Sequence, residues 1–348
     1  MFSFLKPYIF SLDPETAHNL AIKSLKLNLV PKQFFEIENE DLLAVNLFEK
    51  KLKNPIGLAA GFDKSAEVYN SLYNFGFGFI EVGTVTPKLQ LGNPKPRIFR
   101  LEQDYALINR LGFNNDGSDE VLKRISKNTP NGILGINIGP NKDTNDKIED
   151  FKICLSKFHN QADYITINIS SPNTEGLRNF HNHENLTELL DKINYLRKKI
   201  KMQKSIFLKI SPDLDDKNIN YIIELLLKYN INGVILSNTT DKNREKLIDK
   251  QKKETGGLSG KPLKNLSTNL IKKFYKETKG KIDIIGVGGV DSGQSAFEKI
   301  SAGAKAVQLY TGMVYNGPGI IKTIKQELIS ILRKEKIKSL DQAVGIDL

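Results

Sequence analysis

The chain has 348 residues, of which 39% are hydrophobic and 26% are charged, as is typical of a soluble globular protein. It contains no run of 18 apolar residues, so no segment is expected to cross a membrane as a helix. A single cysteine, Cys154, excludes an internal disulfide and a site built from several cysteines, and no metal site is expected. The formal net charge is +11, but the lysine pairs lie in helix-like segments without interleaved aromatic residues, so no nucleic-acid partner is expected.

Residues 1–30 differ in pattern from the rest of the chain. Apolar side chains recur at helical spacing from Phe2 to Leu12, and Asp13 followed by Pro14 is a strong helix start. Two short amphipathic helices are therefore predicted as a small N-terminal extension.

Two interpretations of this helical pair remain open. Its apolar faces either pack on the main domain or lie in a membrane interface and guide a lipid-soluble ligand. The pair lacks the uninterrupted apolar core and cleavage site of a signal peptide. We therefore expect a peripheral protein on the cytoplasmic side of a bacterial cell membrane.

After a polar connector at residues 31–50, strand-like segments alternate with helix-like ones. Eight strands are predicted, at Ile56–Ala60, Phe79–Val85, Ile133–Ile138, Tyr164–Ile169, Ile206–Ile210, Gly233–Ser237, Ile282–Val287 and Ala306–Leu309. A doubly wound open sheet is the alternative, but eight units in about 260 residues favour a closed (β/α)8 TIM barrel. We assign the barrel to residues 51–335 and a C-terminal tail to residues 336–348.

Three consecutive predicted strands each carry a polar residue between two aliphatic neighbours. These residues are Asn137, Asn168 and Lys209, each near the C-terminal end of its strand. Because strand side chains alternate, the aliphatic neighbours should face the helices and the polar residues the barrel axis. Buried amide and ammonium groups are costly without partners, so a polar ligand is expected at this mouth of the barrel.

The stretch NISSPN, Asn168 to Asn173, ends one of these strands, because Pro172 cannot continue it. Its amides and hydroxyls can hold a polar planar ligand, and Ser171 can serve as nucleophile or proton acceptor. A simple turn is the competing interpretation, since Ser, Pro and Asn are turn formers.

Glycine clusters follow the last two predicted strands, at Gly286–Gly289 and Tyr310–Gly312, and a third lies at Gly256–Gly260. The loops after these two strands commonly hold a phosphate in TIM barrels. The dinucleotide fingerprint G-x-G-x-x-G opening a helix is absent, so FMN is favoured over NAD. Lys209 would then stabilise negative charge on a reduced flavin, although an internal ion pair is an alternative role for it.

Together, the motifs closely resemble the dihydroorotate dehydrogenases, specifically the quinone-linked class 2. The resemblance runs in order from the first helices to about residue 320 and rests on AAGFDK (59–64), GTVTP (83–87), NPKPRIFRL (93–101), NRLGFNN (109–115), NISSPNTEGLR (168–178), SNTT (237–240), GGLSGKPL (256–263) and GVGG (286–289).

The resemblance implies a role for particular residues. Ser171 matches the catalytic base, where class 1 enzymes use cysteine. Substrate-binding positions correspond to Lys64, Asn109, Arg110, Leu111, Gly112, Phe113, Asn168, Asn173, Asn238 and Thr239. FMN-binding positions correspond to Ala60, Gly61, Phe62, Asp63, Lys64, Thr84, Asn137, Asn168, Lys209, Ser237, Gly260, Gly289, Tyr310 and Thr311. A quinone tunnel corresponds to His18, Arg100 and Tyr310. The family more often has threonine where this chain has Ser237.

The implied reaction is oxidation of (S)-dihydroorotate to orotate in pyrimidine (UMP) biosynthesis, with FMN as hydride acceptor and a membrane quinone as final electron acceptor. The partners implied are dihydroorotate and orotate, the quinone and membrane lipid, and a monomer is expected. Two alternatives are a flavin barrel that uses fumarate, NAD or oxygen, and a barrel that binds flavin or lipid without turnover. Ser171 and the apolar N-terminal helices argue against the first.

Overall fold

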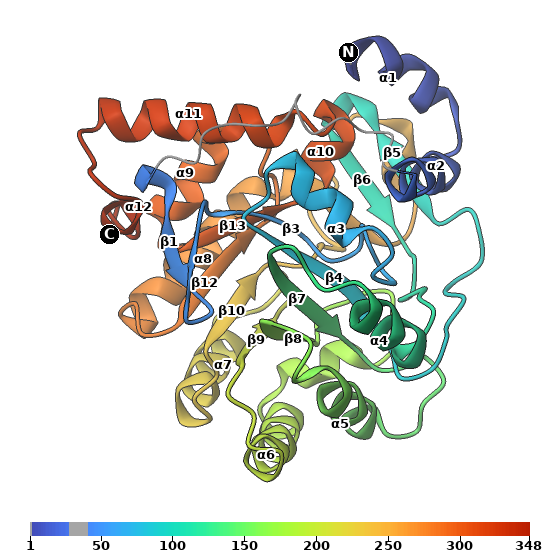
Figure 1. The fold of residues 1–348 in the computed structure, drawn as a ribbon, viewed down its shortest axis with the longest axis vertical. Coiled ribbons are helices and arrows are strands. Elements are labelled where there is room, and N and C mark those ends of the chain that lie inside the picture. The colour runs from blue at the N-terminus through green and yellow to red at the C-terminus, as the bar shows by residue number, and fades with distance from the viewer. Residues whose placement is uncertain (1, 28–40) are drawn as a thin grey trace.

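The computed structural model describes residues 2–27 and 41–348 (Figure 1). Eight parallel strands close into a barrel in the order β10-β12-β13-β3-β4-β7-β8-β9. Their bounds are β3 Ile56–Leu58, β4 Phe79–Val85, β7 Ile133–Ile138, β8 Tyr164–Asn168, β9 Ser205–Lys209, β10 Gly233–Leu236, β12 Asp283–Val287 and β13 Ala306–Leu309. The predicted TIM barrel is confirmed, and each predicted strand corresponds to one of these eight.

Helices surround the barrel, as Figure 1 shows for α5, α6 and α7. They are α3 Tyr69–Leu72, α4 Ser118–Lys127, α5 Lys147–Phe158, α6 His183–Lys199, α7 Asp216–Lys228, α8 Lys264–Thr278, α9 Gly293–Ser301, α10 Thr311–Asn316, α11 Ile320–Lys334 and α12 Leu340–Ala343. Short 3-10 turns lie at Asp41–Leu43, Tyr73–Phe75, Glu102–Asp104, Leu177–His181, Lys250–Lys253 and Lys261–Leu263. Helices α5, α6 and α7 start at side-chain caps: Asp215, for example, accepts a hydrogen bond from Asn218 N at the start of α7.

Four aromatic rings close the N-terminal end of the barrel. Phe48 stacks on Tyr164 with ring centroids 3.9 Å apart, and the rings of Phe79 and Phe207 lie edge-on at 5.6 and 5.2 Å from Phe48. We call these four residues the aromatic plug. Phe48 comes from the turn of a small antiparallel hairpin of β1 (Val45–Leu47) and β2 (Lys50–Leu52).

The last ten residues of the predicted connector, 41–50, form regular structure. Residues 41–50 contain a 3-10 turn and most of the β1–β2 hairpin, while residues 31–40 lie outside the described residues. The predicted C-terminal tail also packs on the barrel domain. Its Leu340 and Ala343 are fully buried, and Gly345 N and Asp347 N donate hydrogen bonds to Ile300 O and Ser301 O.

A polar layer lies above the aromatic plug, toward the C-terminal ends of the strands. Glu81 on β4 is fully buried and accepts hydrogen bonds from Asn137 Nδ2, Tyr164 Oη, Thr166 Oγ1 and Gln308 Nε2, at 2.8 to 3.1 Å. These donors satisfy both carboxylate oxygens, as a charge buried in a barrel interior requires.

The two long connections meet in a three-stranded sheet outside the barrel. Strands β5 (Ile98–Leu101) and β6 (Ala106–Asn109) come from the first connection, and β11 (Gly257–Gly260) from the second. Strand β6 is the middle strand and pairs antiparallel with both neighbours. In this sheet Asn109 pairs with Gly257, and Ala106 pairs with Gly260.

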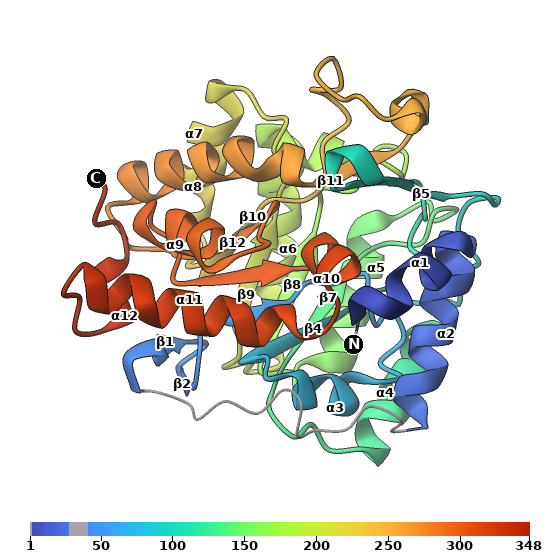
Figure 2. The same ribbon diagram turned by 90° about the horizontal axis from the view of Figure 1, so that it is seen from above.

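The N-terminal helical pair, α1 (Phe2–Ser11) and α2 (Pro14–Lys26), lies beside this sheet, as Figure 2 shows. Both predicted helices are present, and Asp13 caps α2 by accepting from Glu15 N and Thr16 N. No helix in residues 2–27 or 41–348 combines the length and apolar character needed to cross a membrane.

Candidate functional site

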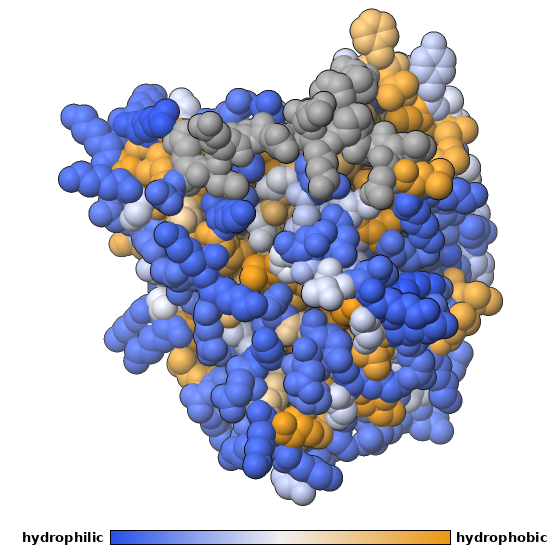
Figure 3. Space-filling view, viewed as in Figure 1, coloured by the Kyte–Doolittle hydropathy of each residue, from blue (hydrophilic) through white to orange (hydrophobic). Residues whose placement is uncertain are grey.

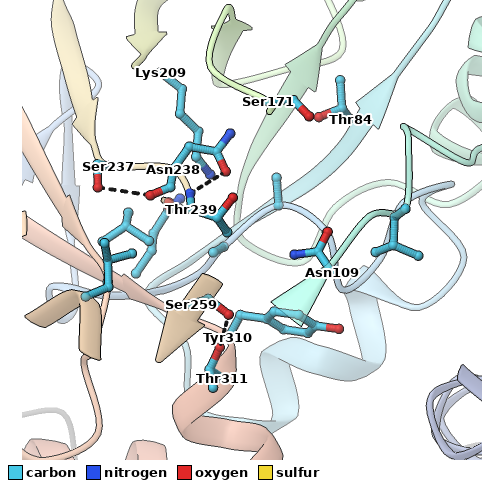
Figure 4. Close-up of a pocket in the computed structure, with 18 of the residues that line it drawn as sticks. Thr84, Asn109, Ser171, Lys209, Ser237, Asn238, Thr239, Ser259, Tyr310 and Thr311 are labelled. Carbon is cyan, nitrogen blue, oxygen red and sulfur yellow. Dashed lines mark hydrogen bonds between the residues drawn. The ribbon is translucent and has the colours of Figure 1, made fainter. Parts of the chain in front are cut away.

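A cavity of about 1030 Å³, counting its solvent-open part, lies at the C-terminal mouth of the barrel (Figure 4). Its walls come from the ends of the barrel strands, from β11 and from the loop after β6. A cavity here follows from the topology, because the βα loops of a TIM barrel all gather at this face.

Most residues singled out from the sequence line this one cavity. Among the expected cofactor residues these are Ala60, Gly61, Lys64, Thr84, Asn168, Lys209, Ser237, Gly260, Gly289, Tyr310 and Thr311. Among the expected substrate residues they are Lys64, Asn109, Leu111, Gly112, Phe113, Asn168, Asn173, Asn238 and Thr239, and Ser171 lies with them.

Four of the residues expected to bind cofactor or substrate do not line the cavity. Asn137 lies one layer deeper and reaches the wall through Thr84, whose Oγ1 donates to Asn137 Oδ1 at 2.6 Å. Asp63 accepts hydrogen bonds from Glu67 N and Val68 N, both at 2.8 Å, and so shapes the loop after β3. The guanidinium of Arg110 pairs with Glu254 at 2.7 Å and points away from the cavity wall.

Phe62, the fourth of these residues, belongs to an aromatic path between the cavity and α2. Its ring lies edge-on to Tyr310 at 5.9 Å and to His18 at 5.1 Å between ring centroids. Burial lowers the pKa of His18 to about 3, with the Lys64 charge adding to the effect. The imidazole beside Phe62 therefore adds no charge to this path near neutral pH.

Arg100 also lies outside the cavity and ties α1 to the sheet. Its Nη1 donates to Leu12 O at 2.9 Å and Phe10 O at 3.1 Å, at the C-terminal end of α1, where a cation is favourable. Arg97 beside it forms a two-pronged ion pair with Glu15 of α2, at 2.7 and 3.1 Å. Two arginines of one segment therefore hold the two N-terminal helices.

The polar wall of the cavity is internally hydrogen-bonded. Asn168 Nδ2 donates to Thr84 Oγ1 at 3.0 Å, while its Oδ1 accepts from Ser170 N and Ser170 Oγ at 3.1 and 2.8 Å. Asn238 Nδ2 donates to Ser170 Oγ at 2.8 Å. These bonds fix the amide groups and leave few rotamers open to them.

Ser171 lies in the loop that follows β8, among amide groups. Its Oγ accepts a hydrogen bond from Asn173 N at 3.2 Å, and Asn173 Nδ2 donates to Asn109 O at 3.1 Å. Figure 4 shows Ser171 and Thr84 on one side of the cavity and Ser259, Tyr310 and Thr311 on another. Hydroxyl groups therefore lie on both of these sides of the cavity.

Two lysines, the partly buried Lys64 and the buried Lys209, supply the positive charge of the cavity. Burial lowers the pKa of Lys64 to about 8. Burial also lowers the pKa of Lys209, and the negative charge of Glu81 opposes that shift. The sequence left an internal ion pair open as a role for Lys209, and Glu81 is an inward carboxylate that the sequence predictions did not include.

A glycine-rich cradle lies against the start of α8. A Cβ on Gly289 would come within 2.9 Å of Lys264 N, and a Cβ on Gly312 within 2.4 Å of Val290 O, so only glycine allows these approaches. Backbone amides at the first turn of a helix suit a phosphate. This cradle and the lysines fit the phosphate and the ring of the FMN expected from the sequence.

Gln308 is a cavity residue that the sequence predictions missed. It stands on β13 between Val307 and Leu309, the same pattern that singled out Asn137, Asn168 and Lys209. Glu81 between Ile80 and Val82 follows the pattern as well. Applying the alternation rule to every strand would have found both.

Comparisons with known proteins agree with this geometry. A family model described as dihydroorotate dehydrogenase matches residues 42–332. The Rhodospirillum rubrum protein named dihydroorotate dehydrogenase (quinone) is 43% identical over 343 residues, which cover 98% of this chain and 93% of that protein. The Idiomarina loihiensis protein of the same name is 46% identical over 335 residues, with 94% and 100% covered.

Solved structures agree as well. The crystal structure of Eimeria tenella DHODH in complex with ferulenol has a TM-score of 0.91 and 40% sequence identity, and the match covers 96% of each chain. The ligand-free type of the same protein also has a TM-score of 0.91 at 40% identity, over 96% of this chain and 99% of that one. The chain therefore belongs to the dihydroorotate dehydrogenase family, and within it to the quinone-dependent class.

Proposed function

We propose that the protein oxidises (S)-dihydroorotate to orotate in pyrimidine (UMP) biosynthesis, with FMN as hydride acceptor and a membrane quinone as final electron acceptor. The observation that carries the proposal is the meeting of Ser171, two lysines and five asparagines around one cavity. These groups suit a ring that is rich in amides, bears a carboxylate and loses a proton and a hydride.

The phosphate of FMN would lie in the glycine-rich cradle, and its ring would lie against the polar wall of the cavity. Gly260, Gly289 and Thr311 lie where the phosphate end would bind, and Thr84, Asn168 and Lys209 where the ring would bind. Bound FMN supplies the two-electron acceptor that no side chain of the protein can provide. The Lys209 ammonium would stabilise negative charge at its end of the cavity.

The substrate would be held by amide groups and one cation. Asn109, Asn173 and Asn238 can pair with the ring amides, and the Lys64 ammonium can pair with the carboxylate. The hydrogen bonds that already fix Asn173 and Asn238 reduce the entropy lost when the substrate is positioned.

Ser171 would accept the proton from C5 of the dihydroorotate ring. A serine hydroxyl is a weak base, so it must pass its own proton onward as it takes the new one, to ordered water in the loop. The Asn173 N–H that donates to Ser171 Oγ stabilises negative charge on that oxygen as the transfer proceeds.

The quinone would approach along the aromatic path from α2 to Tyr310. Phe4 and Tyr8 of α1 are 83% and 76% exposed, and Figure 3 shows hydrophobic residues gathered over α1. An exposed apolar helix next to an apolar path suits a lipid-soluble acceptor and a peripheral position on the cytoplasmic side of the cell membrane.

Removing α1 and α2 tests the quinone part of the proposal. Reduction of the bound flavin by dihydroorotate should continue, while oxidation by a long-chain quinone should fall about tenfold more than oxidation by a soluble dye. Equal losses with both acceptors would show that the helices have only a structural role.

An absorption spectrum of the purified protein tests the central reaction. The protein should be yellow, and anaerobic dihydroorotate should bleach it in the absence of any other reductant. Bound flavin that dihydroorotate cannot bleach would favour a binding barrel without turnover. Protein that takes up no flavin on reconstitution would exclude every flavin-based function.

A further inference from the structure

Lys299 of α9 is a fully buried lysine that lies outside the cavity of the candidate site. Its Nζ donates to Thr268 Oγ1 at 3.0 Å, to Ser267 Oγ at 3.1 Å and to Lys264 O at 3.3 Å. In the part of the chain that the structure describes, these three oxygen atoms are its hydrogen-bond partners, and none belongs to a carboxylate. A buried cation is usually paired with an anion, so Lys299 lacks the partner that its burial requires.

The surroundings of Lys299 are also unfavourable for a cation. Its three partners lie at the start of α8, and the N-terminal end of a helix favours anions over cations. The neighbouring Glu298 pairs with Lys264 Nζ at 2.8 Å. Burial lowers the pKa of Lys299 to about 7, and the charge of Glu298 opposes this shift while the charge of Lys264 adds to it. An anion bound near the start of α8 would stabilise this ammonium.

The glycine-rich cradle rests on the same part of α8. A Cβ on Gly289 would come within 2.6 Å of Lys264 Cβ, so the loop after β12 lies against the residue whose carbonyl accepts from Lys299. Ser267 Oγ also donates to Val287 O at 2.5 Å, which ties the start of α8 to the end of β12. The Lys299 ammonium therefore lies behind the cradle, separated from it by the first residues of α8.

The phosphate of FMN carries close to two negative charges at neutral pH. We propose that Lys299 is the buried countercharge of this phosphate, so that it makes the cavity prefer a flavin with a phosphate over a flavin without one. Lys299 has no exposed atom and would touch neither the phosphate nor the ring. It acts through its charge, which the protein interior screens far less than water does. The inference rests on the proposed function, because it takes FMN as the ligand.

The test compares FMN with riboflavin, which has the same ring and no phosphate. The full-length protein, freed of flavin, is titrated with each compound at pH 7, and the quenching of flavin fluorescence reports the two dissociation constants. We expect an effect of about tenfold for the charged form of Lys299, and about half of the free protein carries that charge at pH 7. Lys299→Met should therefore weaken FMN binding about fivefold and riboflavin binding less than about twofold.

Two variants are the matched controls. Thr268→Val removes one hydrogen bond of Lys299 at nearly constant volume and keeps its charge. Lys325→Met removes another buried lysine, which belongs to α11 and does not line the cavity. Both should keep the preference of the natural chain for FMN over riboflavin. Equal weakening of the two flavins by Lys299→Met, or the same loss of preference in a control, would overturn the role of Lys299 and leave the proposed function intact.

A second measurement uses the natural chain and therefore stands even if Lys299→Met does not fold. A phosphate near Lys299 raises its pKa, so FMN binding at pH 8 should take up roughly 0.4 of a proton for a tenfold effect. Calorimetry in buffers with different ionisation enthalpies measures this uptake. Riboflavin binding is subtracted, because it contains any contribution from groups near the ring such as Lys64. Equal uptake with the two flavins would overturn the inference.

The other groups around α9 do not compete for this proton. Lys264 and Glu298 pair with each other, and Glu327 of α11 accepts from Gly293 N at the first turn of α9. Gly286 of β12, against which the Lys299 side chain packs, carries no charge. The difference in uptake between the two flavins should therefore disappear in Lys299→Met. Failure of the natural chain to bind either flavin would overturn the proposed function together with this inference.

Discussion

Ser171 is the residue whose chemistry the proposed reaction needs most. Ser171→Ala should slow the reduction of bound flavin by dihydroorotate by about 10²–10⁴-fold, because the proton at C5 loses its acceptor. Flavin content should be unchanged, since the proposed role of Ser171 is toward the substrate and not toward the flavin. Stopped-flow absorbance under anaerobic conditions measures the rate.

Ser171→Cys is the informative companion variant. A thiol is more acidic than a hydroxyl, so the cysteine variant should reduce its flavin faster than the alanine variant. If all three proteins were reduced at the same rate, Ser171 would have no part in proton transfer.

Lys64 should make product binding depend on pH. Burial lowers its pKa to about 8, so the free protein carries the ammonium below pH 8 and loses it above. Orotate, which bears a carboxylate, should therefore bind about tenfold more weakly at pH 9.5 than at pH 7. Isothermal titration calorimetry gives the dissociation constants.

Lys64→Arg is the control for this prediction, because a guanidinium stays protonated over the whole range. Any weakening of orotate binding at pH 9.5 that remains in this variant comes from ionisation of orotate or of other groups in the protein. An identical pH dependence in both proteins would contradict the role of Lys64.

At the scale of elements, Arg178 connects the loops after three neighbouring strands. Its Nε donates to Ser170 O and its Nη2 to Thr239 O, both at 3.2 Å. Its Nη1 pairs with Asp213 at 3.2 Å and with Asp241 at 3.1 Å. The loops after β8 and β10 carry residues that we propose to bind the substrate, so one guanidinium sets their positions relative to each other and to the loop after β9.

Arg178→Lys should therefore raise the KM for dihydroorotate about tenfold, because a single ammonium cannot reach all of these partners. Flavin content should not change. Arg197→Lys is the control: Arg197 Nη1 bonds to Asn230 O before β10, at the opposite end of the barrel. The same KM in both variants would mean that the loops keep their positions without Arg178.

At the scale of the whole molecule, the aromatic plug shows how the chain closes its barrel. Phe48 and Glu49 form the two-residue turn between β1 and β2, and both have a φ of +58°. Such turns favour Asn and Gly, so Phe48 occupies a conformation that it disfavours. Its ring packs on three others inside the barrel, and this burial offsets the cost of the turn.

Phe48→Ala should lower the free energy of unfolding by about 3–5 kcal/mol, the usual cost of deleting a buried aromatic ring. Glu49→Gly relieves the adjacent turn position and removes no buried ring, so stability should stay the same or rise slightly. Urea denaturation measures both. Equal destabilisation by the two changes would show that the turn matters and the ring does not.

The sequence alone determined the barrel and most of its cavity. Strand alternation is a local property, so the eight strands and the inward direction of Asn168 and Lys209 could be predicted from neighbouring residues. The motifs likewise indicated the family and the residues that line the cavity. Boundaries differed by a residue or two, because the last hydrogen bond of a strand depends on its neighbour.

Only the tertiary structure decided which polar groups meet. Glu81 and Gln308 are 227 residues apart, and their hydrogen bond exists because β4 and β13 face the same barrel interior. The tertiary structure likewise pairs Arg97 with Glu15 and places Phe48 inside the barrel. It also pairs Arg110 with Glu254, which turns Arg110 away from the cavity. Such pairings depend on closure of the barrel, and no local pattern of residues encodes which distant side chains closure brings together.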